Sequence, residues 1–141
     1  MDDAETPPKT LSVDEANAIL PRVTSLVEQL RALERSLTET AQRLTGLAAK
    51  LSAGNGHPLQ AVKEQVKNLS LHQLQLVEAF QSAFKQLEAL GALLKDFRMG
   101  LVDFYSVRDG ELVFLCWKVG EERIAFWHGL EEGYAGRQPL E

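Results

Sequence analysis

Apolar residues recur at alternating steps of three and four along the first two thirds of the chain. Eight of nine such positions from Val23 to Leu51 are apolar, and so are ten of eleven from Leu59 to Leu94. This spacing is typical of the seam of a coiled coil. Between the two runs, the segment 53–58 holds two glycines and a proline, which break a helix. The pattern therefore predicts an antiparallel helical hairpin.

The two predicted seams fit each other in one register, which places Val23 opposite Leu90 and Leu51 opposite Val62. In that register the only two polar seam residues, Thr40 and Gln73, face each other. A buried polar pair costs stability but fixes register. We therefore expect Thr40 and Gln73 to set the register of the hairpin.

The start of the first helix is marked by Ser12 followed by Glu15, the spacing of a capping box, so the helix is expected to begin at Val13. Pro21 then predicts a kink or the first residue of a second helix. Residues 1–11 are acidic and proline-rich, and we expect them to form a mobile tail.

Past Gly100 the hydrophobic period changes to two. Residues 101–107, 111–119 and 123–128 read as strands, joined by turns at Asp109-Gly110 and Gly120-Glu121. The prediction is an α+β fold: a long antiparallel helical hairpin with a small three-stranded antiparallel β-meander. We expect the capped helix and hairpin over 12–98, and the meander with a C-terminal tail over 99–141, to form one compact domain.

Two-residue turns assign the strand residues to two faces of the meander. One face is nearly all apolar and is expected to pack on the helices: Val102, Phe104, Val113, Leu115, Trp117, Val119, Ile124, Phe126 and His128. The other face is mixed: Asp103, Tyr105, Phe114, Cys116, Lys118, Arg123, Ala125 and Trp127. A one-residue change at the second turn would exchange the two faces of the third strand.

Composition and charge exclude several classes of function. The chain has 141 residues, 45% of them hydrophobic, and a net charge of −5. It contains no basic block, which argues against nucleic-acid binding and against a membrane-surface helix. No apolar run is long enough to cross a bilayer. A single cysteine excludes an internal disulfide and, with no signal-like N-terminus, favours a cytoplasmic protein.

Candidate chemistry centres on Cys116. It and His128 are weak metal-ligand candidates, because the predicted register points them to opposite faces and a zinc site needs three or four ligands. As a nucleophile, Cys116 has conflicting neighbours, since Lys118 and Arg123 would lower its pKa and Asp103 would raise it. We therefore expect no catalytic residues, no metal and no cofactor, and a buried structural thiol at Cys116.

The mixed face is the candidate contact surface for a partner or ligand. Eight of the ten aromatic residues lie at or after Phe97, and aromatic side chains beside cations make good contact surfaces. The candidate contact residues are Asp103, Tyr105, Phe114, Cys116, Lys118, Arg123, Trp127 and, from the tail, Arg137. In the glycine-rich segment 133–137 we expect a turn in which Arg137 pairs with Glu131 or Glu132; a backbone nest for an anion is the alternative.

Three stretches of the chain resemble a bacterial family known as domain of unknown function 2203. They are residues 12–21, with Ser12, Glu15 and Pro21; residues 100–104, before the Asp109-Gly110 turn; and residues 115–137, from Leu115-Cys116-Trp117-Lys118 through Gly133-Tyr134-Ala135-Gly136-Arg137. Some members carry a division-initiation label, but the family has no assigned activity. The resemblance therefore supports the fold and implies no mechanism.

A single hairpin buries only one seam, and a central strand that is apolar on both faces needs cover on both sides. Both points favour a homodimer or higher oligomer, with Val77 and Phe84 widening the apolar face of the second helix. The leading expectation is a non-enzymatic interaction or scaffold module that binds itself and an unknown protein partner. The alternative is a small-ligand-binding protein or an enzyme that uses the mixed face of the sheet.

Overall fold

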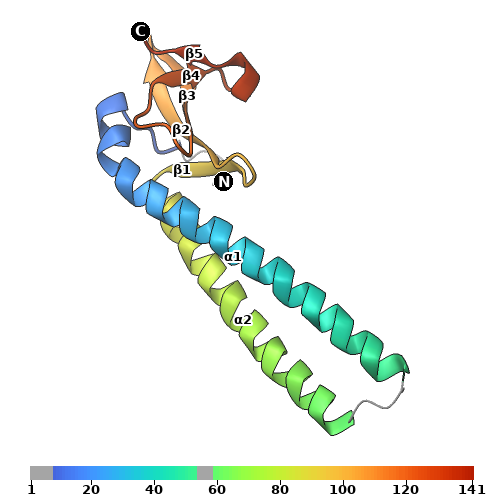
Figure 1. The fold of residues 1–141 in the computed structure, drawn as a ribbon. Helices are drawn as coiled ribbons and strands as arrows, with labels where there is room; N and C mark the ends of the chain where they lie inside the picture. Colours follow the sequence, from blue (N-terminus) through green and yellow to red (C-terminus); the bar gives the residue numbers. More distant parts are fainter. Residues whose placement is uncertain (1–7, 54–58) are drawn as a thin grey trace, which may run out of the picture. The chain divides into compact units, whose positions relative to one another are not determined.

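The computed structural model describes residues 8–53 and 59–141 and has the expected α+β fold (Figure 1). Two long helices pack together, and an antiparallel sheet of five strands follows them. The elements are α1 (Val13–Ala53), α2 (Leu59–Ala89), β1 (Ala92–Asp96), β2 (Leu101–Arg108), β3 (Glu111–Lys118), β4 (Phe126–His128), a 3-10 turn η2 (Tyr134–Gly136) and β5 (Gln138–Pro139). The predicted helix break at 54–58 and the first seven residues of the predicted tail lie outside the described residues.

The predicted capping box begins α1. The backbone N–H of Glu15 donates to Ser12 Oγ at 3.0 Å, and the backbone N–H of Ser12 donates to Glu15 Oε1 at 2.8 Å. Both bonds satisfy amides that a helix start leaves without partners. Pro21 lies inside α1, so no second helix begins there.

The predicted seam is the least exposed stripe of both helices. No seam position of α1 is exposed, whereas every other residue from Thr38 to Ala53 is. Thr40 is buried at 4% exposure, and Gln73 is half-buried. In α2 the seam is exposed only at its first position, Leu59. This burial agrees with the 3–4 spacing, because one stripe of each helix is removed from water.

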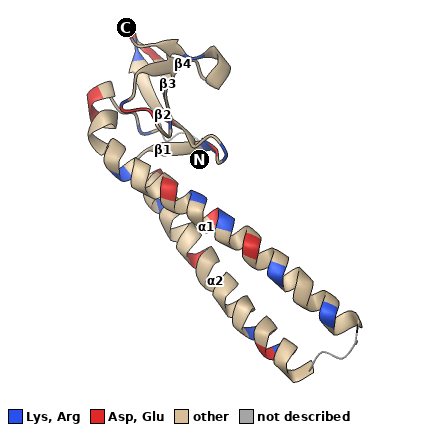
Figure 2. Cartoon of the chain, viewed as in Figure 1, with Lys and Arg blue, Asp and Glu red and all other residues tan. Residues whose placement is uncertain are grey.

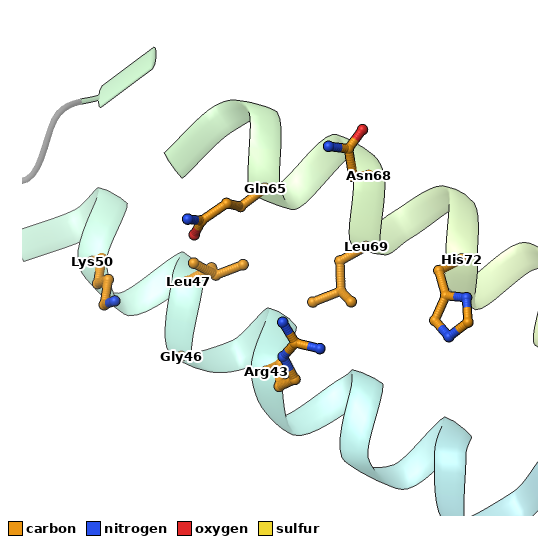
Figure 3. A pocket seen from close by; sticks show the side chains of 8 residues that line it. All are labelled: Arg43, Gly46, Leu47, Lys50, Gln65, Asn68, Leu69 and His72. Atoms are coloured by element: carbon orange, nitrogen blue, oxygen red, sulfur yellow. The ribbon is translucent and has the colours of Figure 1, made fainter. Parts of the chain in front are cut away.

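The described chain divides into two compact units. One combines the residues up to Glu28 with Lys85–Glu141, and the other is Gln29–Phe84, the outer part of the helical hairpin. Within the second unit, Leu47 of α1 and Leu69 of α2 lie between the two helices (Figure 3). They line a pocket in which residues 43–50 of α1 face residues 65–72 of α2.

The second helix is shorter than the heptad pattern predicts. It ends at Ala89, and Leu94, which we expected on the helical seam, lies in strand β1. Gly91 explains the difference, because its φ of +91° is a left-handed conformation that favours glycine and ends helices. The backbone N–H of Gly91 donates to Glu88 O at 2.9 Å and closes the last turn.

The sheet has five strands rather than three, in the order β1-β2-β3-β4-β5. The predicted pairing of β2 with β3 is confirmed, from Leu101 opposite Lys118 to Arg108 opposite Glu111. The two added strands form the edges. β1 replaces predicted helix, and the two-residue β5 pairs the predicted tail with β4.

The predicted pairing of the third strand is wrong by one residue. Phe114 lies opposite His128 and Cys116 opposite Phe126, so Phe126 and His128 share a face with Asp103 and Cys116, and Trp127 lies on the other face. The connection between β3 and β4 runs from residue 119 to 125 and is not a two-residue turn. A two-residue turn fixes which residues of the next strand share a face with β3, whereas this longer connection does not. Because side chains alternate along a strand, a shift of one residue in the pairing moves every side chain of β4 to the opposite face.

Both faces of the central strand are covered within the chain, since Val113 to Trp117 are all buried. On one face the tail returns over the sheet, with the Arg137 guanidinium 3.9 Å from the centre of the Phe126 ring. At the start of α1, Asn17 Oδ1 accepts a 2.8 Å hydrogen bond from the backbone N–H of Ile124. The two-sided apolar strand therefore needs no second subunit to cover it.

Neither of the described helices has an apolar stretch of the length and hydropathy that spanning a membrane requires. Along α1 and α2, residues of both charge signs are interspersed (Figure 2).

Candidate functional site

Three buried side chains that could act on a ligand or metal meet on one face of the sheet. Asp103 comes from β2, Cys116 from β3 and His128 from the end of β4, and their exposed fractions are 3%, 0% and 1%. One ligand atom from each lies within 4.8 Å of the others. We call these three residues the Asp-Cys-His cluster. The corrected pairing of β4 creates it, because the predicted pairing put His128 on the opposite face.

Two hydrogen bonds orient the imidazole ring of His128. Its Nδ1 lies 2.8 Å from the backbone oxygen of Gly129, and its Nε2 lies 3.1 Å from Asp103 Oδ1. A carbonyl oxygen only accepts, so Nδ1 carries a hydrogen and donates it. One proton then lies between Nε2 and the carboxylate. Burial raises the pKa of Asp103, while its contacts with His128 oppose that rise.

The thiol of Cys116 faces the same carboxylate and is protonated at neutral pH. Burial, and after it the charge of Asp103, raise the pKa of Cys116 to about 11, although Arg137 acts in the opposite direction. Because the thiolate is the reactive form of cysteine, this environment does not suit a nucleophile. The expectation of a structural thiol fits this burial.

We predict that Cys116 in the native, chelator-treated protein reacts with a disulfide reagent at least about 100-fold more slowly at pH 7 than in the urea-unfolded chain, because its raised pKa alone removes that much thiolate. The chain has one cysteine, so the released chromophore reports this thiol alone. Equal rates in the native and unfolded states would show that Cys116 is accessible and activated.

Arg137 pairs with Glu121, not with Glu131 or Glu132 as we expected. Its Nη1 donates to Glu121 Oε1 at 3.2 Å, and Nη2 bonds the other carboxylate oxygen of Glu121. The guanidinium also lies over the rings of Phe126 and Tyr134, at 3.9 and 4.4 Å. Glu132 instead accepts a hydrogen bond from the backbone N–H of Gly129. These contacts hold the tail segment 129–137 against the sheet beside the Asp-Cys-His cluster.

The remaining candidate contact residues do not form one surface. Tyr105 and Phe114 pack ring to ring at 4.6 Å beside the cluster, and Phe114 is buried. Trp127 lies on the opposite face, with the Arg108 guanidinium 5.0 Å from its ring centre. Lys118 is half-buried near the Tyr134 ring, whereas Arg123 is exposed in the β3–β4 connection.

Two surface cavities carry polar groups without selecting a ligand class. One, of about 460 Å³, is lined by Arg108 and Arg123 but also by the acidic Glu141. The other, of about 610 Å³, lies between α1 and α2 in the second unit, where Gly46 leaves the helix surface open (Figure 3). Its lining residues are Arg43, Gly46, Leu47, Lys50, Gln65, Asn68, Leu69 and His72.

The cluster contains two residues that the sequence singled out as weak metal candidates, Cys116 and His128, and one that it assigned to the contact surface, Asp103. Alternation along β2 and β3 does place Asp103 beside Cys116. The missing signal was the length of the β3–β4 connection, because only that length decides the face of His128. Gly129, which accepts from His128, carried no sequence signal.

One comparison with known proteins gives a match. The model of a family described as an uncharacterized conserved protein (DUF2203) matches residues 9–140. No curated protein and no solved structure matches the chain.

Proposed function

Because the chain belongs to DUF2203, a family described only as uncharacterized, we propose from its own geometry that it is a non-enzymatic interaction module that forms a homodimer through α2. The observation that carries this proposal is a group of exposed apolar side chains on that helix. Leu71 is 52% exposed, Leu74 60% and Val77 36%. We call these three residues the α2 apolar patch.

The three side chains of the α2 apolar patch are exposed to solvent, although the same helix already buries a separate apolar seam. Exposed apolar side chains that gather in one place mark interaction surfaces. The patch occupies two turns of α2, all within Gln29–Phe84. Next to it, Phe84 is half-buried and stacks on Phe80 with their ring centres 6.3 Å apart.

A second copy of the chain suits this patch in both spacing and charge. A two-fold axis at Leu74 would place Leu71 of one copy opposite Val77 of the other, and so make the contact self-complementary. From residue 59 to 84, α2 carries two lysines and two glutamates, so two copies of this segment do not repel each other through net charge. These features support a symmetric partner over a strongly charged one.

The chemistry of the sheet supports a non-enzymatic role. The Cys116 thiol is buried and protonated, and Arg137, the cation beside it, is already paired with Glu121. The contact surface proposed here therefore differs from the mixed face that the sequence suggested.

We expect sedimentation equilibrium to show a dimer at tens of micromolar protein, where about 7 kcal/mol of association free energy becomes visible. Replacing Leu71 and Leu74 together by Glu should weaken association at least about 100-fold, since four charges would be buried at the two-fold contact. The control is Gln65→Glu with His72→Glu, which adds the same charge at two exposed positions on the side of α2 opposite the patch and removes no leucine.

The control variant should remain dimeric, and circular dichroism should show equal helix content in both variants. A monomeric wild-type chain at this concentration, or a dimer that survives the Leu71/Leu74 double substitution, would refute the proposed dimer surface.

A further inference from the structure

We infer that the Asp-Cys-His cluster binds one divalent transition-metal ion with the ligand preferences of zinc. This goes beyond the proposed interaction module and concerns the other compact unit of the chain, which holds β2, β3 and β4. The argument rests on the donor set, its spacing, its burial and the groups that hold its ligands.

The donor set is the one that zinc prefers. Zinc sites are built from thiolate sulfur, imidazole nitrogen and carboxylate oxygen, and Asp103, Cys116 and His128 supply one of each. Soft thiolate and imidazole ligands select such ions over magnesium or calcium, which take oxygen ligands. Three protein ligands leave the fourth corner of a tetrahedron for a small external ligand.

The spacing requires only small movements. In a tetrahedral zinc site with metal–ligand distances near 2.0–2.3 Å, neighbouring donor atoms lie about 3.3–3.5 Å apart. His128 Nε2 and Asp103 Oδ1 are already 3.1 Å apart, and all three donor atoms lie within 4.8 Å of one another. An ion inserted at their centre therefore needs side-chain adjustments of about an ångström and no movement of the strands.

Nε2 of His128 faces the other two donors and can bind a metal in place of the proton that it shares with Asp103. Nδ1 of His128 donates to the carbonyl of Gly129 at 2.8 Å, which directs Nε2 toward Asp103 and Cys116. Metal-bound histidines almost always have this arrangement, with the second ring N–H donated to a carbonyl or carboxylate that fixes the ring. Because Gly129 is not part of the cluster, this is an observation independent of the three donors.

Charge balance favours a divalent ion in this buried place. A carboxylate and a thiolate carry two negative charges, which one divalent cation cancels, so the occupied cluster is neutral where an unpaired charge would be costly. Arg137 lies beside Cys116, but its charge is already paired with Glu121. Its N–H groups can donate to a metal-bound thiolate, which is the kind of outer contact that stabilises such ligands.

The test is a titration of the full-length, chelator-treated protein with Co²⁺, a spectroscopic substitute for zinc. We expect one equivalent to produce the intense visible bands of four-coordinate cobalt together with a near-ultraviolet thiolate-to-cobalt band. Zn²⁺ should remove both by displacement. Cys116→Ser keeps the size of the side chain and should remove the thiolate band. It should also weaken metal binding by more than the loss of about 10–100-fold that is typical when only a group supporting a ligand is removed.

Two further variants make the result specific. Cys116→Ala tests the same ligand with a small apolar residue that suits a buried site, and circular dichroism checks that both Cys116 variants fold. His72→Ala removes an exposed histidine of α2 and should leave the spectrum and the stoichiometry unchanged. No cobalt band in the wild-type protein, a thiolate band that survives Cys116→Ser, or loss of binding in His72→Ala would each overturn the inference. The dimer test is read by sedimentation, so its outcome is independent.

Discussion

Replacing Trp117 by alanine should destabilise the fold by about 3–5 kcal/mol, the usual cost of removing a large aromatic side chain from a packed core. Trp117 is 1% exposed near the end of β3, and its Nε1–H donates to the backbone oxygen of Glu121 at 2.9 Å. The substitution thus leaves a cavity and releases the β3–β4 connection. Urea unfolding, followed through the fluorescence of Trp127, measures the change in the free energy of unfolding.

Trp117→Phe separates the two contributions. It fills most of the space and removes the indole N–H, so it should cost about 1 kcal/mol for the partly buried carbonyl of Glu121 left without its donor. A loss below 1 kcal/mol for Trp117→Ala would show that the residue does not hold the core of this unit.

The second large effect concerns the polar positions of the helical seam. Replacing Thr40 and Gln73 together by leucine should stabilise the protein by about 1–3 kcal/mol, because two polar groups are removed from a buried apolar seam. If the two side chains face each other, each single substitution leaves the other polar group without its partner. The double variant should then be more stable than the sum of the two single effects predicts.

A double-mutant cycle in urea measures this coupling, which reaches about 0.5–3 kcal/mol for residues in contact. Additive effects would contradict the register that pairs Thr40 with Gln73. Disulfide crosslinking of cysteines placed at Leu26 and Leu87, in a Cys116→Ala background, provides an independent check. The crosslink should form readily in the wild-type seam and less selectively in the leucine double variant, because polar seam pairs restrict register.

Together the proposed dimer and the inferred metal site assign different roles to the two compact units. The outer hairpin, Gln29–Phe84, would join two chains through the α2 apolar patch. The other unit, around the sheet, would hold an ion in the Asp-Cys-His cluster, beside a tail segment fastened by Arg137 and Glu121. Each role is tested by variants that do not touch the other.

The sequence alone determined the features that depend on local periodicity and on tight turns. The 3–4 spacing predicted both helices and their buried stripe, and Ser12 with Glu15 marked the first residue of α1, because capping needs only neighbouring residues. The Asp109-Gly110 turn was sufficient for the full pairing of β2 with β3. Both its residues adopt the positive φ that a two-residue hairpin turn demands.

The tertiary structure alone decided where periodicity ends and how distant segments meet. Leu90 and Leu94 continue the heptad in the sequence, but Gly91 takes a left-handed conformation after the end of α2, and β1 begins at Ala92. The face of β4 depends on a seven-residue connection held by Asn17 and Trp117, contacts that no local pattern encodes. Because side chains alternate along a strand, a one-residue difference in the pairing of β3 with β4 exchanges the two faces of β4. That reversal is the reason why His128 meets Asp103 and Cys116 instead of facing away from them.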